Sequence, residues 1–138
     1  MLVFSTNKEL SLSSWDSEYS MVISKRLLTI CFRLIDSKGI IAHESTLYKC
    51  TPLAISSGYF GKVIGNCKTH KEHKGKGLYG AVVIYITVNY CLKNPILFVD
   101  DNNIASKKGL QKIGFESIGR FKIKNKYLSG LFYSVEKY

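Results

Sequence analysis

A short basic stretch that contains glycines has the residue types and spacing best suited to binding chemistry. It reads KTHKEHKGKGLYGAVV over residues 68–83, with a lysine before each of Gly75 and Gly77. Glycine lets backbone N–H groups approach a ligand closely, and a helix N-terminus favours negative charge. A strand, this loop and a following helix would therefore suit a pyrophosphate. A solvated basic turn that caps a helix is the alternative, because neither a Walker loop nor a Rossmann fingerprint is present.

A second stretch, VDDNNIASKKGLQKIGF over residues 99–115, follows the first after an apolar segment. Taken alone, Asn103 is an ordinary residue for starting a helix, and Gly114 is an ordinary residue for ending one. The order of the two stretches is more informative than either alone. It consists of a basic glycine loop, an apolar helix, a strand, then Asn-x-x-Ser and Lys-x-Gly-Phe.

That combination resembles the GNAT superfamily of acyl-CoA-dependent N-acyltransferases. The phosphate loop of the family is Arg/Gln-x-x-Gly-x-Gly/Ala. The segment KGKGLY puts Lys74 at its first position, Gly77 at its glycine and Tyr79 at its small residue. Lysine is a conservative departure there, whereas tyrosine is a larger one. The downstream matches to the family pattern are Asn103, Ser106, Lys112, Gly114 and Phe115.

The resemblance implies the fold class: an α/β fold with a GNAT-like mixed, mostly antiparallel sheet flanked by helices and a splayed central pair of parallel strands. It also implies acetyl-CoA as co-substrate, with pantetheine between those strands and backbone N–H groups binding the thioester carbonyl. An amine then attacks directly, so Cys67 is expected to be structural rather than nucleophilic. The cofactor-binding residues implied by the resemblance are Asn66, Cys67, Lys68, Thr69, Lys74, Gly75, Lys76, Gly77, Leu78, Tyr79, Asn103, Ser106 and Lys112.

Two acid–base groups that are familiar in the superfamily are absent from this sequence. Many members carry a tyrosine seven residues after the asparagine as general acid, but that position here is Leu110. The usual carboxylate or histidine on the strand before the loop falls near Val63 or Gly65. Two hypotheses follow. Either other residues serve, or the chain binds CoA with weak or no transferase activity.

His43, Glu44 and Asp101 are the catalytic candidates, and His70 and Asp100 are further ones. Consecutive strand residues point to opposite faces, so at most one of His43 and Glu44 faces the site. The alternatives are a core histidine and a solvated carboxylate. A metal site at the loop histidines is not expected, because the loop is rich in lysine and lacks a pair of carboxylates.

The hydrophobic pattern predicts the elements that position these residues. Residues 1–25 are expected to form short irregular elements, and residues 50–60 a loop. Length and the glycine-rich approach favour a helix over residues 77–92, whose periodicity is ambiguous. The other predictions are an antiparallel hairpin of strands 27–35 and 40–48, strands over 61–69, 96–100, 115–123 and 128–138, and a helix over 103–113.

Length and composition fit one domain over residues 1–138, which the resemblance implies is GNAT-like, and a hydrophobic fraction of 46% supports a folded core. The net charge of +10 indicates an anionic partner. Four single cysteines without a CxxC pair fit a reduced, cytoplasmic chain. The longest uncharged run is too short and too polar to span a membrane and no targeting segment is visible, so no membrane partner is expected.

We therefore expect an N-acetyltransferase that transfers acetyl from acetyl-CoA to a primary amine of a small molecule, with amino sugars the favoured acceptors. A catalytically degenerate CoA-binding module is one alternative. A basic nucleic-acid-binding domain is another, but no nucleic-acid motif is present and no specific nucleic acid is expected. The short N-terminal part leaves two options open. It is truncated, or a second subunit of a homodimer completes the acceptor pocket.

Overall fold

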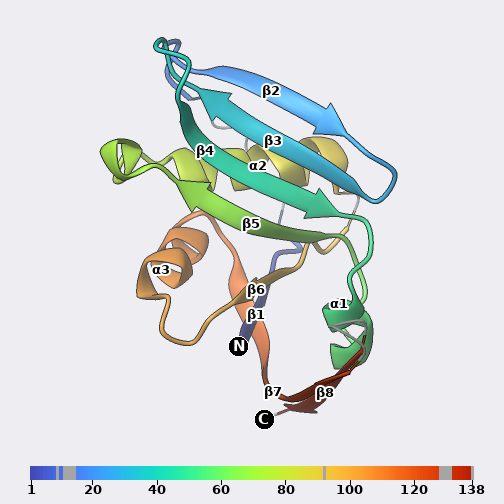
Figure 1. Cartoon of the computed structure of the whole chain (residues 1–138). Helices are drawn as coiled ribbons and strands as arrows, with labels where there is room; N and C mark the ends of the chain where they lie inside the picture. The colour runs from blue at the N-terminus through green and yellow to red at the C-terminus, as the bar shows by residue number, and fades with distance from the viewer. Residues whose placement is uncertain (9, 11–14, 92, 128–131, 138) are drawn as a thin grey trace.

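Two antiparallel four-stranded sheets and the helices packed against them form the fold (Figure 1). The computed structural model describes residues 1–8, 10, 15–91, 93–127 and 132–137. One sheet has the strand order β2-β3-β4-β5, and the other has the order β6-β1-β7-β8. The elements are β1 (Leu2–Ser5), β2 (Ser20–Lys25), β3 (Thr29–Ile35), β4 (Ile41–Tyr48), α1 (Pro52–Ser57), β5 (Val63–Thr69), the 3-10 helix η1 (Lys71–His73), α2 (Leu78–Tyr90), β6 (Leu97–Val99), α3 (Ile104–Lys112), β7 (Glu116–Tyr127) and β8 (Phe132–Lys137).

The predicted hairpin of β3 and β4 is confirmed, and one carboxylate builds its turn. Asp36 Oδ1 accepts hydrogen bonds from the backbone N–H groups of Lys38 and Ile40, at 2.9 Å each. Buried and half-buried side chains alternate along β3, as expected for a strand with one face on the core. The buried set faces α2 and consists of Ile30, Phe32 and Leu34.

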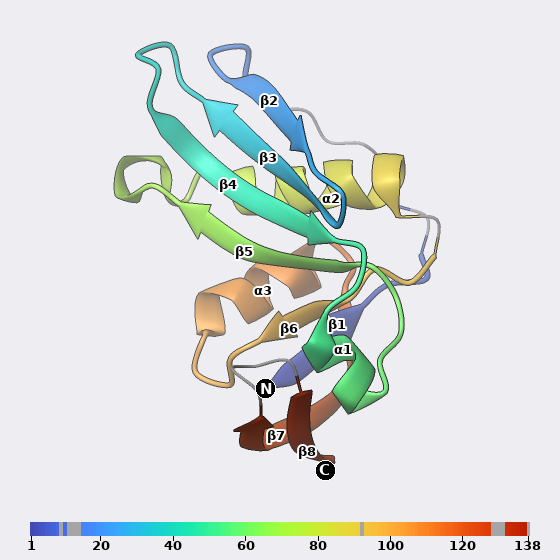
Figure 2. The same ribbon diagram turned by 45° about the vertical axis from the view of Figure 1, so that its right-hand side comes forward.

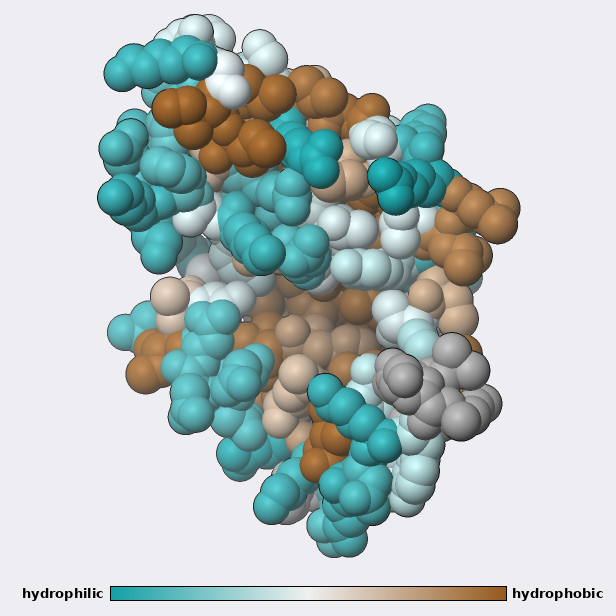
Figure 3. All heavy atoms as spheres, viewed as in Figure 1, coloured by the Kyte–Doolittle hydropathy of each residue, from teal (hydrophilic) through white to brown (hydrophobic). Residues whose placement is uncertain are grey.

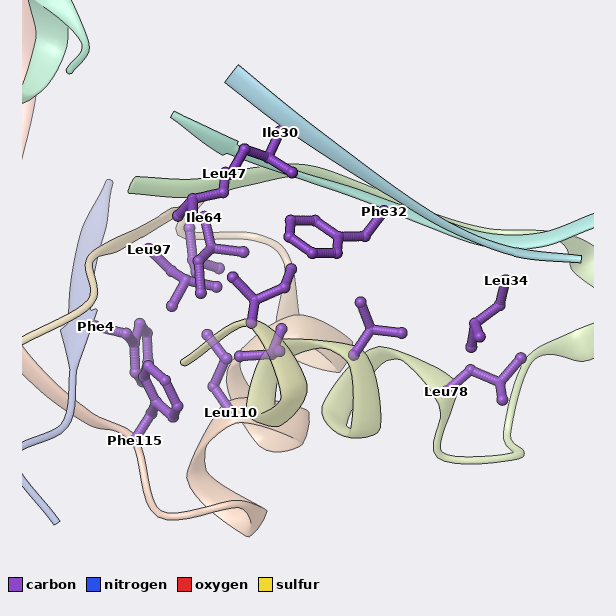
Figure 4. Close-up of a cluster of buried hydrophobic side chains, with 14 of the residues drawn as sticks. Phe4, Ile30, Phe32, Leu34, Leu47, Ile64, Leu78, Leu97, Leu110 and Phe115 are labelled. Carbon is purple, nitrogen blue, oxygen red and sulfur yellow. The ribbon is translucent and has the colours of Figure 1, made fainter. Parts of the chain in front are cut away.

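The helix predicted over residues 77–92 is confirmed as α2, which lies across one face of the first sheet (Figures 1 and 2). Its buried side chains lie on several sides of the helix, because the sheet covers one side and α3 packs on another. This burial explains why periodicity alone does not separate helix from strand here. A single hydrophobic cluster extends from Ile30 past α2 to Leu110 and Phe115 (Figure 4).

The N-terminal strand β1 lies in the interior of the second sheet. It pairs antiparallel with β6 and with β7, so that Val3 lies opposite both Phe98 and Gly119. Val3 and Phe4 are fully buried. A Cβ atom at Gly119 would lie 1.8 Å from the Tyr59 hydroxyl, so the ring of Tyr59 requires a glycine there.

The expected fold class is wrong in its sheet. The structure has two antiparallel four-stranded sheets, not one mixed sheet with a splayed central pair of parallel strands flanked by helices. The parallel contact between β5 and β6 is a single bridge between Val63 and Ile96. The physical reason is the N-terminal strand, because β1 takes one edge of β6 and joins it antiparallel to β7. The other edge of β6 meets β5 only at its beginning.

Other predictions made from the sequence differ from the structure near the N-terminus and in the turns. Residues 1–25 were expected to be irregular, but they contain β1 and β2. The expected loop at residues 50–60 contains α1, because Thr51 caps its N-terminus and Pro52 fits its first turn. Leu27 and Leu28 were expected in a strand but lie exposed in the turn before β3. Within the described ranges, no helix combines the length and the apolar character needed to cross a membrane.

Candidate functional site

A cleft of about 760 Å³ lies between the end of β5, the glycine loop, the start of α2 and one side of α3. Figure 3 shows the surface hollowed below β5, with a floor that is more hydrophobic than the rim. Most of the residues implied by the family resemblance line this cleft, although they come from segments far apart in the sequence. They are Cys67, Lys68, Thr69, Lys74, Gly75, Gly77, Leu78, Tyr79, Asn103, Ser106 and Lys112.

Two of the expected cofactor-binding residues do not line the cleft. Asn66 is exposed on β5 and has a φ of +51°, where the pairing of β4 and β5 shifts its register. Lys76 lines a separate cavity of about 410 Å³ on the other side of the glycine loop, together with Trp15 and Asp16. The loop therefore separates two cavities. Lys74 lines the cleft on one side, and Lys76 lines the smaller cavity on the other.

The N-terminus of α2 is the feature of the cleft best suited to an anion. Among the helices that the structure describes, α1, η1 and α3 each have a side chain that accepts a hydrogen bond at the N-terminus, but α2 has none. Its cap, Gly77, has a φ of +74°, and the first backbone bond within the helix runs from the N–H of Ala81. The N–H groups of the first turn of a helix lack partners within it and carry its positive dipole end. The N–H groups of the first turn of α2 therefore remain available to bind a ligand.

Side-chain charge in the cleft has one sign. Lys68, Lys74 and Lys112 are exposed at its edge, and none of the described residues that line it is acidic. An anion in the cleft at the start of α2 would therefore meet a helix dipole and lysines, whereas Asp16 and Glu18 line the separate cavity on the other side of the loop.

Tyr79 fills part of the cleft beside α3. Ser106 Oγ donates a hydrogen bond of 2.8 Å to the Tyr79 hydroxyl. Gly109 makes room for the ring, because a Cβ atom there would lie 3.3 Å from Tyr79 Cδ1. Burial raises the pKa of Tyr79 to about 12, so the phenol stays protonated in any ordinary buffer. Because Ser106 supplies the donor, the proton of Tyr79 is available to a ligand.

His43, one of the catalytic candidates, lines the cleft within a chain of hydrogen bonds. Its Nδ1 lies 2.7 Å from Thr69 Oγ1, and its Nε2 lies 2.7 Å from Ser45 Oγ. Ser45 donates in turn to Cys67 Sγ at 3.2 Å, so Nε2 is the donor to Ser45 and Nδ1 accepts from Thr69. Burial lowers the pKa of His43 to about 4 and raises the pKa of Cys67 to about 11. Both groups are therefore neutral at physiological pH, which argues against a nucleophilic thiolate.

The other catalytic candidates lie outside the cleft. Glu44 pairs with Arg33 Nε at 2.7 Å on the opposite face of the sheet. Asp101 lies 3.2 Å from the N-terminal ammonium and 3.3 Å from Arg120 Nε, which holds the pKa of that carboxyl below its usual range. His70 caps η1, and Asp100 accepts from the backbone of the turn before α3.

Sequence reasoning missed the contacts that fix the glycine loop. His73 Nε2 donates to Asp36 Oδ2 at 3.1 Å, and its Nδ1 lies 2.7 Å from the Tyr19 hydroxyl. These contacts tie the loop to the β3–β4 turn and to the segment before β2. Residues this far apart in sequence leave no local signal. In the part of the chain that the structure describes, no three His, Cys, Asp or Glu side chains gather as a metal site would require.

Comparison with known proteins adds no family assignment. No family model matches the chain, and no curated protein matches it either. The GNAT resemblance therefore rests on the sequence motifs alone.

Proposed function

We propose that this chain binds acetyl-CoA in the cleft and transfers the acetyl group to a primary amine of a small molecule. One observation carries the proposal. The uncapped N-terminus of α2 opens into a cleft edged by Lys68, Lys74 and Lys112 and without a carboxylate lining. Pyrophosphate at this helix end would accept hydrogen bonds from backbone N–H groups, and the lysines would balance its charge.

β5 supports the part of the proposal that concerns pantetheine and the thioester, because it is an edge strand of its sheet. Beyond its single bridge to β6, its outer edge has no strand partner among the described residues. Backbone N–H groups along that edge would bind the amides of pantetheine and polarise the thioester carbonyl. The amine nitrogen then forms a bond to the carbonyl carbon, the C–S bond breaks, the amine loses one proton, and the departing thiolate gains one.

Tyr79 is the described hydroxyl best placed to return that proton, since it lies in the cleft and its oxygen already accepts from Ser106. The cleft holds no free, ionised base among the described residues that line it. We therefore expect the acceptor to react as the neutral amine that is already present in solution. Amino sugars are the acceptors to test first, and a reduced, cytoplasmic compartment fits the free cysteines.

The lack of a free base also favours a second candidate, a module that binds CoA without turnover. Calorimetry with CoA, followed by a thiol-release assay with acetyl-CoA and a panel of amino sugars, amino acids and aminoglycoside antibiotics, separates the two. Binding with turnover supports the transferase, and binding without turnover supports the second candidate. A chain that binds DNA at physiological salt but not CoA would overturn both.

A further inference from the structure

The turn between β2 and β3 exposes two leucines where turns usually carry polar residues. Leu27 exposes 85% of its surface and Leu28 exposes 58%. The backbone of this turn is held in place, because the N–H of Arg26 donates to Thr29 O at 2.8 Å and the N–H of Lys49 donates to Leu28 O at 3.0 Å. The leucines therefore project from a fixed hairpin end rather than from a loose loop.

Lys49, whose backbone bonds to this turn, leads from the hairpin to further exposed apolar residues. Lys49 also lines a hollow of about 250 Å³ together with Ile55 and Phe60, which are 56% and 76% exposed. Figure 1 shows the β2–β3 turn and the connection from β4 to α1 at the same side of the molecule, and Figure 3 shows hydrophobic side chains protruding there beside hydrophilic ones. We call Leu27, Leu28, Ile55 and Phe60 the apolar tip.

Cations surround the apolar tip, and the chain that builds it carries no acidic residue. Lys25, Arg26 and Lys49 are exposed beside the leucines. Residues 19–35 and 45–71, which supply every residue of the tip and its rim, contain neither Asp nor Glu. A solvent-facing turn gains nothing from two exposed leucines, whereas neighbouring exposed apolar side chains with cations beside them indicate a binding surface.

We propose that the apolar tip docks on an anionic lipid bilayer, with Leu27 and Leu28 entering the headgroup region and the three cations binding lipid phosphates. A bilayer presents negative charge above an apolar layer, which matches exposed leucines with long basic side chains beside them. Nucleic acid would use the cations but not the leucines. A protein partner would need a broader surface than the four side chains of the apolar tip. This inference does not depend on acetyl-CoA binding.

The test compares binding of the whole chain to vesicles of phosphatidylcholine alone and to mixed vesicles with phosphatidylglycerol, by co-sedimentation at physiological salt. The double variant Leu27→Ser/Leu28→Ser removes the projection without changing charge. Its matched control is Ile104→Ser/Ile118→Ser, because these isoleucines are also exposed, at 60% and 52%, but lie elsewhere. We expect the tip variant to bind mixed vesicles about ten-fold more weakly and the control to change less than about two-fold.

A second pair of variants separates the rim from the overall charge of +10. Lys25→Gln/Lys49→Gln should weaken binding to mixed vesicles at least about ten-fold, since each cation at an anionic surface contributes roughly five-fold. Lys71→Gln/Lys108→Gln has the same net charge and should weaken it far less. Circular dichroism verifies that all variants fold.

A fluorophore on Cys50, the exposed thiol beside Lys49, gives a measurement that needs no substitution. Its emission should shift to the blue on mixed vesicles and be quenched by nitroxide-labelled lipid. The proposal is overturned by wild-type chain that does not bind mixed vesicles, by equal binding to both vesicle types, or by equal binding of the tip variant and its control. A tip variant that loses self-association or a protein contact but keeps vesicle binding would also overturn it.

Discussion

Burial, rather than charge pairing, sets the ionisation of three side chains that line the cleft. It lowers the pKa of His43 to about 4 and raises the pKa values of Cys67 and Tyr79 to about 11 and about 12. These three groups are consequently neutral between roughly pH 5 and pH 10. The charge that a ligand meets there comes from lysines and from the start of α2. Proton transfer by His43, Cys67 or Tyr79 must therefore start from the neutral side chain.

His43 makes the stability of the fold depend on pH. Below a pH of about 6.5 the unfolded chain binds a proton at this imidazole, but the folded chain does not until about pH 4. The free energy of unfolding should therefore fall by about 3 kcal/mol as pH decreases through that window. Urea titrations from pH 7 to pH 4 measure it. His43→Gln should flatten this part of the curve, and His70→Gln should leave it in place. Equal curves for the two variants would contradict the assignment.

The high pKa of Tyr79 predicts the shape of the rate profile if the chain is a transferase. The fraction of neutral amine rises with pH, and Tyr79 remains protonated, so initial rates of acetyl transfer should climb through pH 7–9 without a falling alkaline limb. Tyr79→Phe should lower kcat roughly ten-fold, keep the affinity for CoA, and keep the shape of the profile. Thiol release against pH tests this. A falling limb below pH 10 that disappears in Tyr79→Phe would show an acid of lower pKa than the structure indicates.

At the scale of elements, α3 performs two tasks on two faces. Its N-terminus is capped by Asn103, which accepts from the N–H of Ser106 at 3.0 Å, and Ser106 holds Tyr79 in the cleft. Its other face buries Leu110 completely in the core. The position at which the family resemblance places a general acid thus belongs to the hydrophobic core in this chain.

Leu110→Tyr should therefore destabilise the protein and should not supply a proton donor. The larger ring overfills the core and its hydroxyl loses water, which together should lower the free energy of unfolding by about 3 kcal/mol. Gln111→Tyr, on the exposed side of the same helix, should change it by less than about 0.5 kcal/mol. Urea denaturation of both variants tests this. A Leu110→Tyr protein as stable as the control, with faster turnover, would contradict the placement of Leu110 in the core.

Local signals predict the elements better than their arrangement. The turn chemistry between β3 and β4, the approach to α2 and the cap of α3 lie close to the residues they control, and those elements were predicted correctly. The sheet order depends on β1, where Leu2 pairs with Val99 and Arg120, and no local pattern encodes such pairings. The site follows the same rule. Motif residues line the cleft, but Asp36 and Tyr19, which fix its loop, are distant in sequence.

At the scale of the whole molecule, the cleft lies between the end of β5, the start of α2 and α3, and the β2–β3 turn with Leu27 and Leu28 lies at the opposite end of the first sheet (Figure 1). No described residue that lines the cleft is acidic, and the segments that supply the tip, residues 19–35 and 45–71, contain no Asp or Glu. Lys68, Lys74 and Lys112 edge a concave surface beside a helix N-terminus, whereas Lys25, Arg26 and Lys49 lie beside two exposed leucines. Positive charge alone does not distinguish a surface proposed for CoA from one proposed for an anionic bilayer, but the shape of the surface does.

The most direct test of the account is a CoA titration of Gly77→Asp beside Gly39→Asp. Both glycines have a positive φ, +74° and +81°, and a Cβ atom at either meets nothing within 4 Å, so the two substitutions strain the backbone alike. Only Gly77 lines the cleft, where the new carboxylate would oppose the pyrophosphate at the start of α2. We predict that calorimetry finds CoA affinity at least about a hundred-fold lower in Gly77→Asp and within about two-fold of wild type in Gly39→Asp. Wild-type affinity in a folded Gly77→Asp protein would contradict the account.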